Sequence, residues 1–129
     1  GGRQGWTSDM EVMIDLLEEK TINGIGVECL ENMRSWIFFP KGMEISTSTD
    51  GTTFIPMKGN AAWTKTLEQY PAIRERQEES NMATFSIMEP AGRTARYLKV
   101  KVLNYGALPE WHISSGEQAW LFVDEIVIY

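Results

Sequence analysis

The stretch that decides the fold is Trp120-Leu121-Phe122-Val123-Asp124-Glu125-Ile126-Val127-Ile128-Tyr129, the last ten residues of the sequence. Most of its residues are β-branched or aromatic, and one acidic pair interrupts the apolar run. This composition is typical of a strand that is half buried in an all-β core. We expect a closing strand here. We also expect the Trp120 and Phe122 side chains to lie in the core, because bulky aromatic residues dominate sandwich interiors.

Six further runs of this kind precede it along the chain. They are Glu11 to Leu16, Ile22 to Leu30, Met43 to Thr49, Phe54 to Met57, Ala83 to Met88 and Tyr97 to Leu103. In the third run Met43, Ile45 and Thr47 alternate with polar residues, which predicts an antiparallel strand with one buried face. Asp50-Gly51 then predicts a hairpin turn. Seven short strands in one small domain predict an all-β sandwich of two antiparallel sheets.

The length of 129 residues predicts one domain, residues 1–129, that buries a core of its own. Between Ala61 and Asn81 the strand pattern fails, because this segment is polar, charged and broken by proline. We interpret residues 61–81 as a long excursion loop on the surface, since long charged segments usually carry no core. The segment has room for one helical turn, around Ala72 to Glu78.

The net charge argues against some classes of binding partner. Twelve basic residues against 18 acidic residues give a net charge of −6, so phosphate backbones and anionic lipid surfaces are repelled on average. We therefore expect no nucleic-acid partner. No apolar run approaches the roughly 20 residues that a membrane helix needs. The single cysteine, Cys29, cannot form an internal disulfide and is expected to be an inert buried thiol.

A loop directly before the closing strand holds the candidate site. Trp111 and His112, the only histidine, lie between Pro109 and a Ser114-Ser115-Gly116 turn rather than in an alternating run. Their planar surfaces suit contact with a sugar ring or with a neighbouring domain. Trp6 and Trp36 are further candidates for the same ligand-binding or interface role, and Trp36 is alternatively a core residue or a staple of its loop.

The sequence offers no catalytic arrangement. Hydrolysis by two carboxylates needs carboxyl groups about 5 to 9.5 Å apart that converge on one bond, whereas Asp124 and Glu125 are neighbours on a predicted strand and point to opposite faces. His112 has no serine or cysteine partner in a recognisable motif. Asp15 stands alone in an apolar run and is expected to accept a hydrogen bond or to pair with Arg96. We therefore expect no enzymatic activity from this chain.

Three stretches of the sequence carry a family resemblance. They are Val12-Met13-Ile14-Asp15-Leu16, Ser48-Thr49-Asp50-Gly51-Thr52-Thr53-Phe54 and Ala95-Arg96-Tyr97-Leu98-Lys99-Val100. They resemble signatures of the discoidin domain, also called the coagulation-factor V/VIII C-type domain. The resemblance implies a galactose-binding-like jelly roll, which agrees with the all-β sandwich that the strand pattern predicts.

A closer resemblance is carried by Gly5-Trp6, by residues 35–41 and by the stretch from Pro109 to Ile126. These residues are similar to the C-terminal discoidin domain of bacterial family 20 glycoside hydrolases, the exo-acting β-N-acetylhexosaminidases. The residues of that domain's closing motif that this sequence keeps are Trp111, His112, Gly116, Ala119, Trp120, Phe122, Asp124 and Glu125. The resemblance implies a non-catalytic accessory domain of a hydrolase that is exported to the periplasm or the cell surface.

The sequence departs from the family's pattern in three places. Leu17 stands where the family has glycine, and Ile113-Ser114-Ser115 replaces a Pro-Gly-Ala stretch. The strand and loop that usually precede the position of Trp6 are almost absent, so we expect a fragment of the domain. In related family 32 carbohydrate-binding modules that loop and a glutamate matching Glu125 hold a structural calcium ion. Glu125 is therefore the one candidate metal ligand. Calcium takes about six to eight oxygen ligands, and without that loop one carboxylate cannot supply them, so we expect no metal or other cofactor here.

Two hypotheses for function remain. In the first, the domain binds terminal galactose or N-acetylhexosamine of a glycan, with Trp111 as the stacking platform. In the second, it is a purely structural domain that packs against the parent hydrolase's catalytic barrel, with Trp111 and His112 as interface anchors. Membrane docking needs hydrophobic spikes with basic neighbours, and the acidic balance argues against it. We expect a monomer in either case.

Overall fold

The computed structural model describes residues 4–59 and 61–129, which form one antiparallel sheet and short helices. The strand order is β1-β6-β2-β5-β3-β4. The strands are β1 (Gln4–Trp6), β2 (Met10–Asn32), β3 (Gly42–Ser48), β4 (Ile55–Pro56), β5 (Ser80–Leu103) and β6 (Leu121–Ile128). The helices are η1 (Met33–Ser35), α1 (Ala61–Glu68) and η2 (Ile73–Arg76). The expected all-β class is confirmed.

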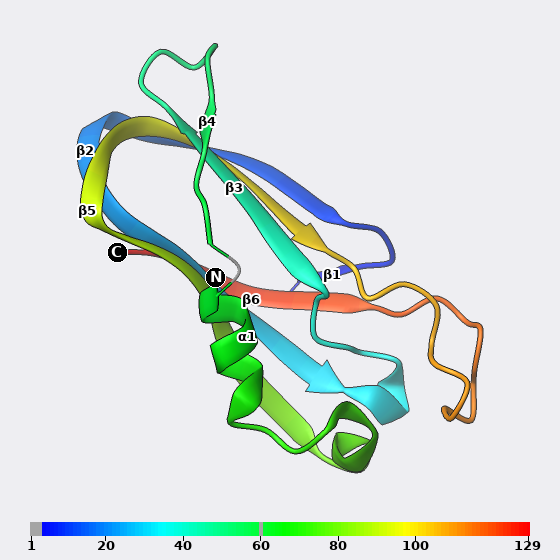
Figure 1. The fold of residues 1–129 in the computed structure, drawn as a ribbon. Helices are drawn as coiled ribbons and strands as arrows, with labels where there is room; N and C mark the ends of the chain where they lie inside the picture. Colours follow the sequence, from blue (N-terminus) through cyan, green and yellow to red (C-terminus); the bar gives the residue numbers. More distant parts are fainter. Residues whose placement is uncertain (1–3, 60) are drawn as a thin grey trace.

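The two layers of the sandwich are parts of one hydrogen-bonded sheet. Strands β2 and β5 pair along nearly their whole length, and the register shifts between Asp15 and Lys20 and again between Ile22 and Gly24. Figure 1 shows both strands folding over at this point. Extra residues in a ladder bend a strand, and the sheet therefore turns back on itself here. The expected separate strands at residues 11–16 and 22–30 are thus one strand, as are those at 83–88 and 97–103.

The core lies between the two layers. Ile25 and Val27 from the second half of β2 and Leu98 and Val100 from the end of β5 are fully buried. The expected alternation in β3 and β5 is present, because apolar side chains at alternate positions face inward. The outer side of that layer consequently carries the polar residues between them.

The closing strand is present, but Trp120 and Phe122 lie on its outer face and not in the core. Leu121 and Val123 are buried, whereas Trp120 is 38% exposed and Phe122 is partly exposed. Side chains alternate along a strand, so a register change of one residue exchanges the two faces. The expectation that Trp120 and Phe122 are core residues is therefore wrong. The smaller aliphatic residues fill the space between the layers.

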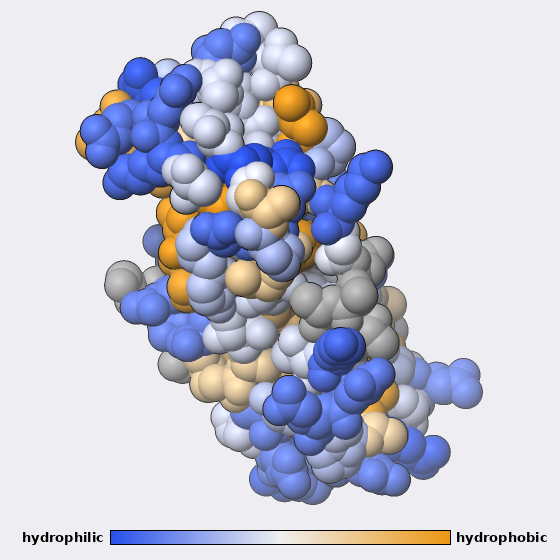
Figure 2. Space-filling model, turned by 60° about the vertical axis from the view of Figure 1, so that its left-hand side comes forward, coloured by the Kyte–Doolittle hydropathy of each residue, from blue (hydrophilic) through white to orange (hydrophobic). Residues whose placement is uncertain are grey.

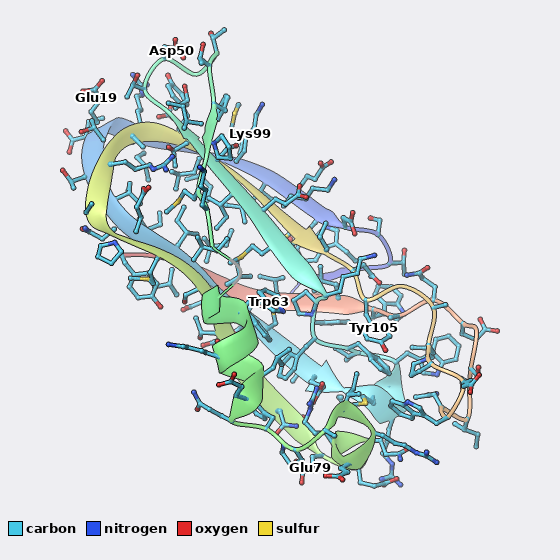
Figure 3. All side chains as sticks on the ribbon, in the orientation of Figure 1. Glu19, Asp50, Trp63, Glu79, Lys99 and Tyr105 are labelled. Atoms are coloured by element: carbon cyan, nitrogen blue, oxygen red, sulfur yellow. The ribbon has the colours of Figure 1, made fainter. Side chains whose placement is uncertain are left out.

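The segment 61–81 is folded and covers part of the core, contrary to the expected solvated loop. Trp63 on α1 is 8% exposed, and its ring stacks on Phe85 with a centroid separation of 4.1 Å. Arg76 in η2 is also buried. Figure 3 shows Trp63 against the sheet, where α1 lies beside β5. The composition of the segment did not predict this packing, because only a few residues of this polar segment contact the core.

Apolar residues are exposed on one face of the molecule. Figure 2 shows them in the middle of this face, among hydrophilic residues, and shows hydrophilic residues predominating toward both ends. Among the residues that the structure describes, no helix has the length and apolar character needed to cross a membrane.

Candidate functional site

A second, smaller core forms at the end of the sandwich, where η1 and the residues that follow it meet the segment 104–120 between β5 and β6. Its buried residues are Met33, Phe38, Leu108 and Ala119, and Trp36, Tyr105 and Trp111 pack against them while remaining partly exposed. We call the three partly exposed rings, Trp36, Tyr105 and Trp111, the aromatic loop end. Trp36 directly follows η1, whereas Tyr105 and Trp111 both lie in the segment 104–120 that joins β5 to β6. The structure thus brings together three of the four candidate residues: Trp36 and Trp111 are partly exposed here, and His112 is buried beside them.

His112 belongs to the interior of this end rather than to its surface. It is 6% exposed, and its Nε2 lies 2.7 Å from the carbonyl oxygen of Met33. Its Nδ1 accepts a hydrogen bond from the backbone N–H of Ser114 at 2.9 Å. Because Nδ1 accepts, Nε2 carries the proton and donates to Met33. Both ring nitrogens are therefore occupied, and His112 fixes the loop that carries Trp111 instead of offering a group to a ligand.

Trp36 is held in an uncommon backbone conformation. Its φ of 65° lies in the left-handed region, which side chains other than glycine rarely adopt. Its N–H donates to the Met33 carbonyl at 3.0 Å, and its carbonyl accepts from the N–H of Trp120 at 2.8 Å. Residues held in sparsely populated conformations cluster at functional sites. The two backbone bonds compensate for the strain and fix the position from which the indole ring projects.

Asn104 ties the loops of this end together and was not among the candidates. Its buried side chain donates to the carbonyl oxygen of Ala119 at 3.0 Å and to that of Trp6 at 3.2 Å. Its Oδ1 accepts from the N–H of Gly106 at 2.8 Å and from the Gln118 amide at 3.0 Å. The sequence does contain a signal for this role. Asn104 stands directly after an alternating strand and before Tyr105 and Gly106, where a loop begins.

The side chains of Trp6 and Glu125 lie away from the aromatic loop end. The Trp6 side chain packs against the main core, and both residues line a hollow of about 450 Å³ between β1, β6 and β2. Glu125 is exposed on β6, in register with Glu28. Within residues 4–59 and 61–129, the structure has no group of three or more side chains of His, Cys, Asp or Glu that is placed to hold a metal ion.

The expected pairing of Asp15 is confirmed. Nε of Arg96 lies 2.9 Å from Oδ1 of Asp15, and Nη2 lies 3.1 Å from Oδ2. The hydrogen bond from Arg96 and a second one from the backbone N–H of Leu17 lower the pKa of Asp15. This pair bridges β2 and β5 beside the register shift, and it is structural.

The turn between β3 and β4 lies at the far end of the molecule from Tyr105 (Figure 3). The Asp50 carboxylate accepts hydrogen bonds from the backbone N–H groups of Thr53 and Thr52, which lower its pKa, and from the Ser48 hydroxyl. Gly51 follows with a φ of +78°. The expected hairpin turn at Asp50-Gly51 is therefore present, and its polar groups are used within the turn.

Comparison with known proteins identifies similar folds and no similar sequence. No family model matches the chain, and no curated protein matches it. A solved structure described as "CpGH89CBM32-6 produced by Clostridium perfringens" is similar over 95% of this chain and 69% of its own, with 20% identity and a TM-score of 0.53. "CBM32-1 from a family 31 glycoside hydrolase from Clostridium perfringens" is 18% identical over 98% and 75%, with a TM-score of 0.47.

A third structure, described as a "pectin binding carbohydrate binding module", is 16% identical over 98% of this chain and 70% of its own, with a TM-score of 0.45. At these identities the first likeness establishes the fold and nothing more. The two-layer sheet described above is a jelly-roll β-sandwich.

Proposed function

We propose that this chain is a non-catalytic carbohydrate-binding accessory domain of a glycoside hydrolase. The main support for the proposal is the aromatic loop end. Its three aromatic rings are partly exposed, and hydrogen bonds fix the backbone around them. Sugar rings present apolar faces that pack on aromatic side chains, and sites for them combine such rings with a few polar groups. The fold likeness to a structure labelled CBM32, a family 32 carbohydrate-binding module, supports the same class.

The ligand that we propose is a terminal galactose or N-acetylhexosamine residue of a glycan. The parent that we propose is an exported exo-β-N-acetylhexosaminidase, because the closing motif from Pro109 to Ile126 resembles the accessory domain of those enzymes. A single ring platform buries little area, so we expect binding in the millimolar range, about −4 kcal/mol. Such weak binding suits a domain that holds a hydrolase near a glycan-rich surface.

The side chains have separate roles in this proposal. Trp111 is the stacking platform, and Trp36 and Tyr105 border it. His112 and Asn104 are positioning residues, because their hydrogen bonds fix the loops and neither side chain is exposed. Trp6, which lines a different hollow, has no part in the site.

A purely structural domain is the second candidate, and a specific observation favours it. Ile113, at the tip of the same loop, is 100% exposed, and Trp120 and Phe122 place aromatic surface on the outer side of β6. Exposed apolar side chains of this size are typical of interface anchors. In this alternative the domain packs against the parent's catalytic barrel and binds no sugar.

Titration of the isotope-labelled chain with galactose and N-acetylglucosamine distinguishes the two. Sugar binding predicts chemical-shift changes around Trp111, which Trp111→Ala abolishes while the spectrum stays dispersed. Trp120→Ala is the matched control, because it removes an exposed indole outside the aromatic loop end and should leave the titration unchanged. A flat titration across a panel of terminal galactosides and N-acetylhexosaminides, on a folded sample, would reject sugar binding at this site and favour the structural alternative.

A further inference from the structure

A concave surface on the outer side of the β2–β5–β3 layer is separate from the aromatic loop end. Its volume is about 600 Å³, within the range of about 300 to 1,000 Å³ that small-ligand sites occupy. We call it the β3–β5 face and define it by its outward residues Glu11, Met13, Glu44, Ser46, Lys99 and Lys101. Figure 3 shows Lys99 on this layer, away from Tyr105 at the loop end.

One row of side chains crosses four strands of this face. Met13 on β2 is in register with Lys99 on β5, which is in register with Ser46 on β3 and, through it, with Pro56 on β4. Met13 is 61% exposed although it is large and apolar. The row therefore has apolar ends and a cation and a hydroxyl group in its middle. Each strand in the row is hydrogen-bonded to its neighbour in the sheet.

The neighbouring row is charged and balanced. Lys101 stands in register between Glu11 and Glu44. Its Nζ lies 3.8 Å from the Glu11 carboxylate, which is longer than a hydrogen bond. Two lysines and two glutamates give the β3–β5 face no net charge. Both rows thus present hydrogen-bonding groups that a ligand can reach.

Lys99 is held in place by an aromatic ring rather than by a carboxylate. Its ammonium group lies 4.1 Å from the centroid of the Phe54 ring. This cation–π contact orients the side chain, and the N–H donors on the side of the ammonium group that faces away from the ring can bind oxygen acceptors. Phe54 belongs to the turn between β3 and β4, so the turn positions the lysine over the face.

We propose that the β3–β5 face is a second binding site, for an internal stretch of a neutral oligosaccharide. Pyranose rings combine apolar C–H faces, which suit Met13 and Pro56, with hydroxyl groups, which suit Lys99 and Ser46. The four strands lie about 4.8 Å apart and span about 14 Å, which is longer than a single sugar ring. The balanced charge of the face and the net charge of −6 favour a neutral glycan over a uronate or sulfated one.

This site is independent of the one at the aromatic loop end, and the test separates them. The labelled chain is titrated with neutral trisaccharides of N-acetylglucosamine, galactose, glucose or xylose, with their monosaccharides, and with a galacturonate trimer. We expect at least one neutral trisaccharide to shift resonances of Met13, Ser46, Lys99 and Lys101. We expect its monosaccharide and the acidic trimer to shift them at least about tenfold more weakly.

Lys99→Met keeps the length and apolar stem of the side chain and removes its donors. We expect it to weaken trisaccharide binding by about tenfold, whereas Lys65→Met, the same change on α1, and Trp111→Ala leave it unchanged. The proposal is overturned if no neutral trisaccharide shifts these resonances, if the acidic trimer binds better, or if Lys99→Met binds as well as the unchanged chain. Loss of monosaccharide binding alone contradicts only the site at the aromatic loop end.

Discussion

Arg76 makes a bidentate ion pair with Glu31 in the interior of the protein. Nε and Nη2 of Arg76 lie 2.9 and 2.8 Å from the two carboxylate oxygens of Glu31, which is 0% exposed. The remaining polar groups are also satisfied, because Nη1 donates to the carbonyl of Pro71 and the Asn81 amide donates to Glu31. This pair joins η2 to β2 across 45 residues of sequence. It explains why the polar segment 61–81 packs on the sandwich.

Removal of the arginine should destabilise the protein strongly. Arg76→Met leaves the Glu31 carboxylate buried without its cation, and breaking a buried pair in this way costs about 3–5 kcal/mol. The free energy of unfolding from urea titration measures the effect. Arg74→Met, an exposed arginine two residues earlier, should change it by less than about 0.5 kcal/mol. The double variant Glu31→Leu/Arg76→Met should recover part of the loss, because neither charge is then left unpaired.

Trp63 should anchor α1 to the core. Trp63→Ala removes the ring that stacks on Phe85, and replacing a buried tryptophan by alanine costs about 3–5 kcal/mol. Lys65→Ala on the exposed side of the same helix is the control, with an expected change within about 0.5 kcal/mol. Equal stability of Trp63→Ala and the unchanged chain would show that α1 contributes nothing to the core.

Cys29 should not react with thiol reagents while the protein is folded. Burial raises the pKa of its thiol to about 12, with a smaller contribution from the charge of Glu28, and only the thiolate is nucleophilic. Mass spectrometry after iodoacetamide treatment at pH 8 should find the native chain unlabelled and the chain in guanidinium labelled. Rapid labelling of the native protein would contradict the buried position.

Acid should weaken the fold through carboxylates whose pKa values are lowered by hydrogen bonds. Backbone N–H groups of Thr53 and Thr52 lower the pKa of Asp50, and the guanidinium groups of Arg96 and Arg93 lower those of Asp15 and Glu89. A lowered folded-state pKa gives stability that is fully present above the unfolded value, about 4, and is lost as the pH falls through the folded value. Stability should therefore be level near pH 7 and fall below about pH 4.

Asp50→Asn tests one of these groups. The asparagine oxygen can still accept from Thr52 and Thr53, but its contribution no longer depends on pH. The unchanged chain should therefore be more stable than the variant at pH 7, and the difference should shrink below about pH 4. Urea titrations at several pH values measure this difference. A constant difference between pH 7 and pH 2.5 would exclude Asp50 as a source of the acid sensitivity.

Local pattern was informative where one face of a strand is buried. The alternation in β3 and at the end of β5 predicted which side chains point inward, because a strand's side chains repeat every two residues. The closing strand was predicted with the wrong face inside, since Trp120 and Leu121 both suit a strand and only the pairing of β6 with β1 and β2 fixes their faces. Trp36 and Trp111 were candidates from the sequence. The contributions of Asn104 and Tyr105 were recognised only from the contacts that they make in the folded structure.

The sequence by itself determined the all-β class, the inward faces of the alternating strands and the aromatic character of one loop. These properties follow from side-chain chemistry and from contacts between residues that are close in sequence. Tertiary structure alone decided that β2 and β5 bend to make two layers from one sheet, that Arg76 and Trp63 are buried, and that His112 faces inward while Trp111 stays partly exposed. Each of these depends on partners tens of residues away, and a linear pattern does not encode which distant groups meet.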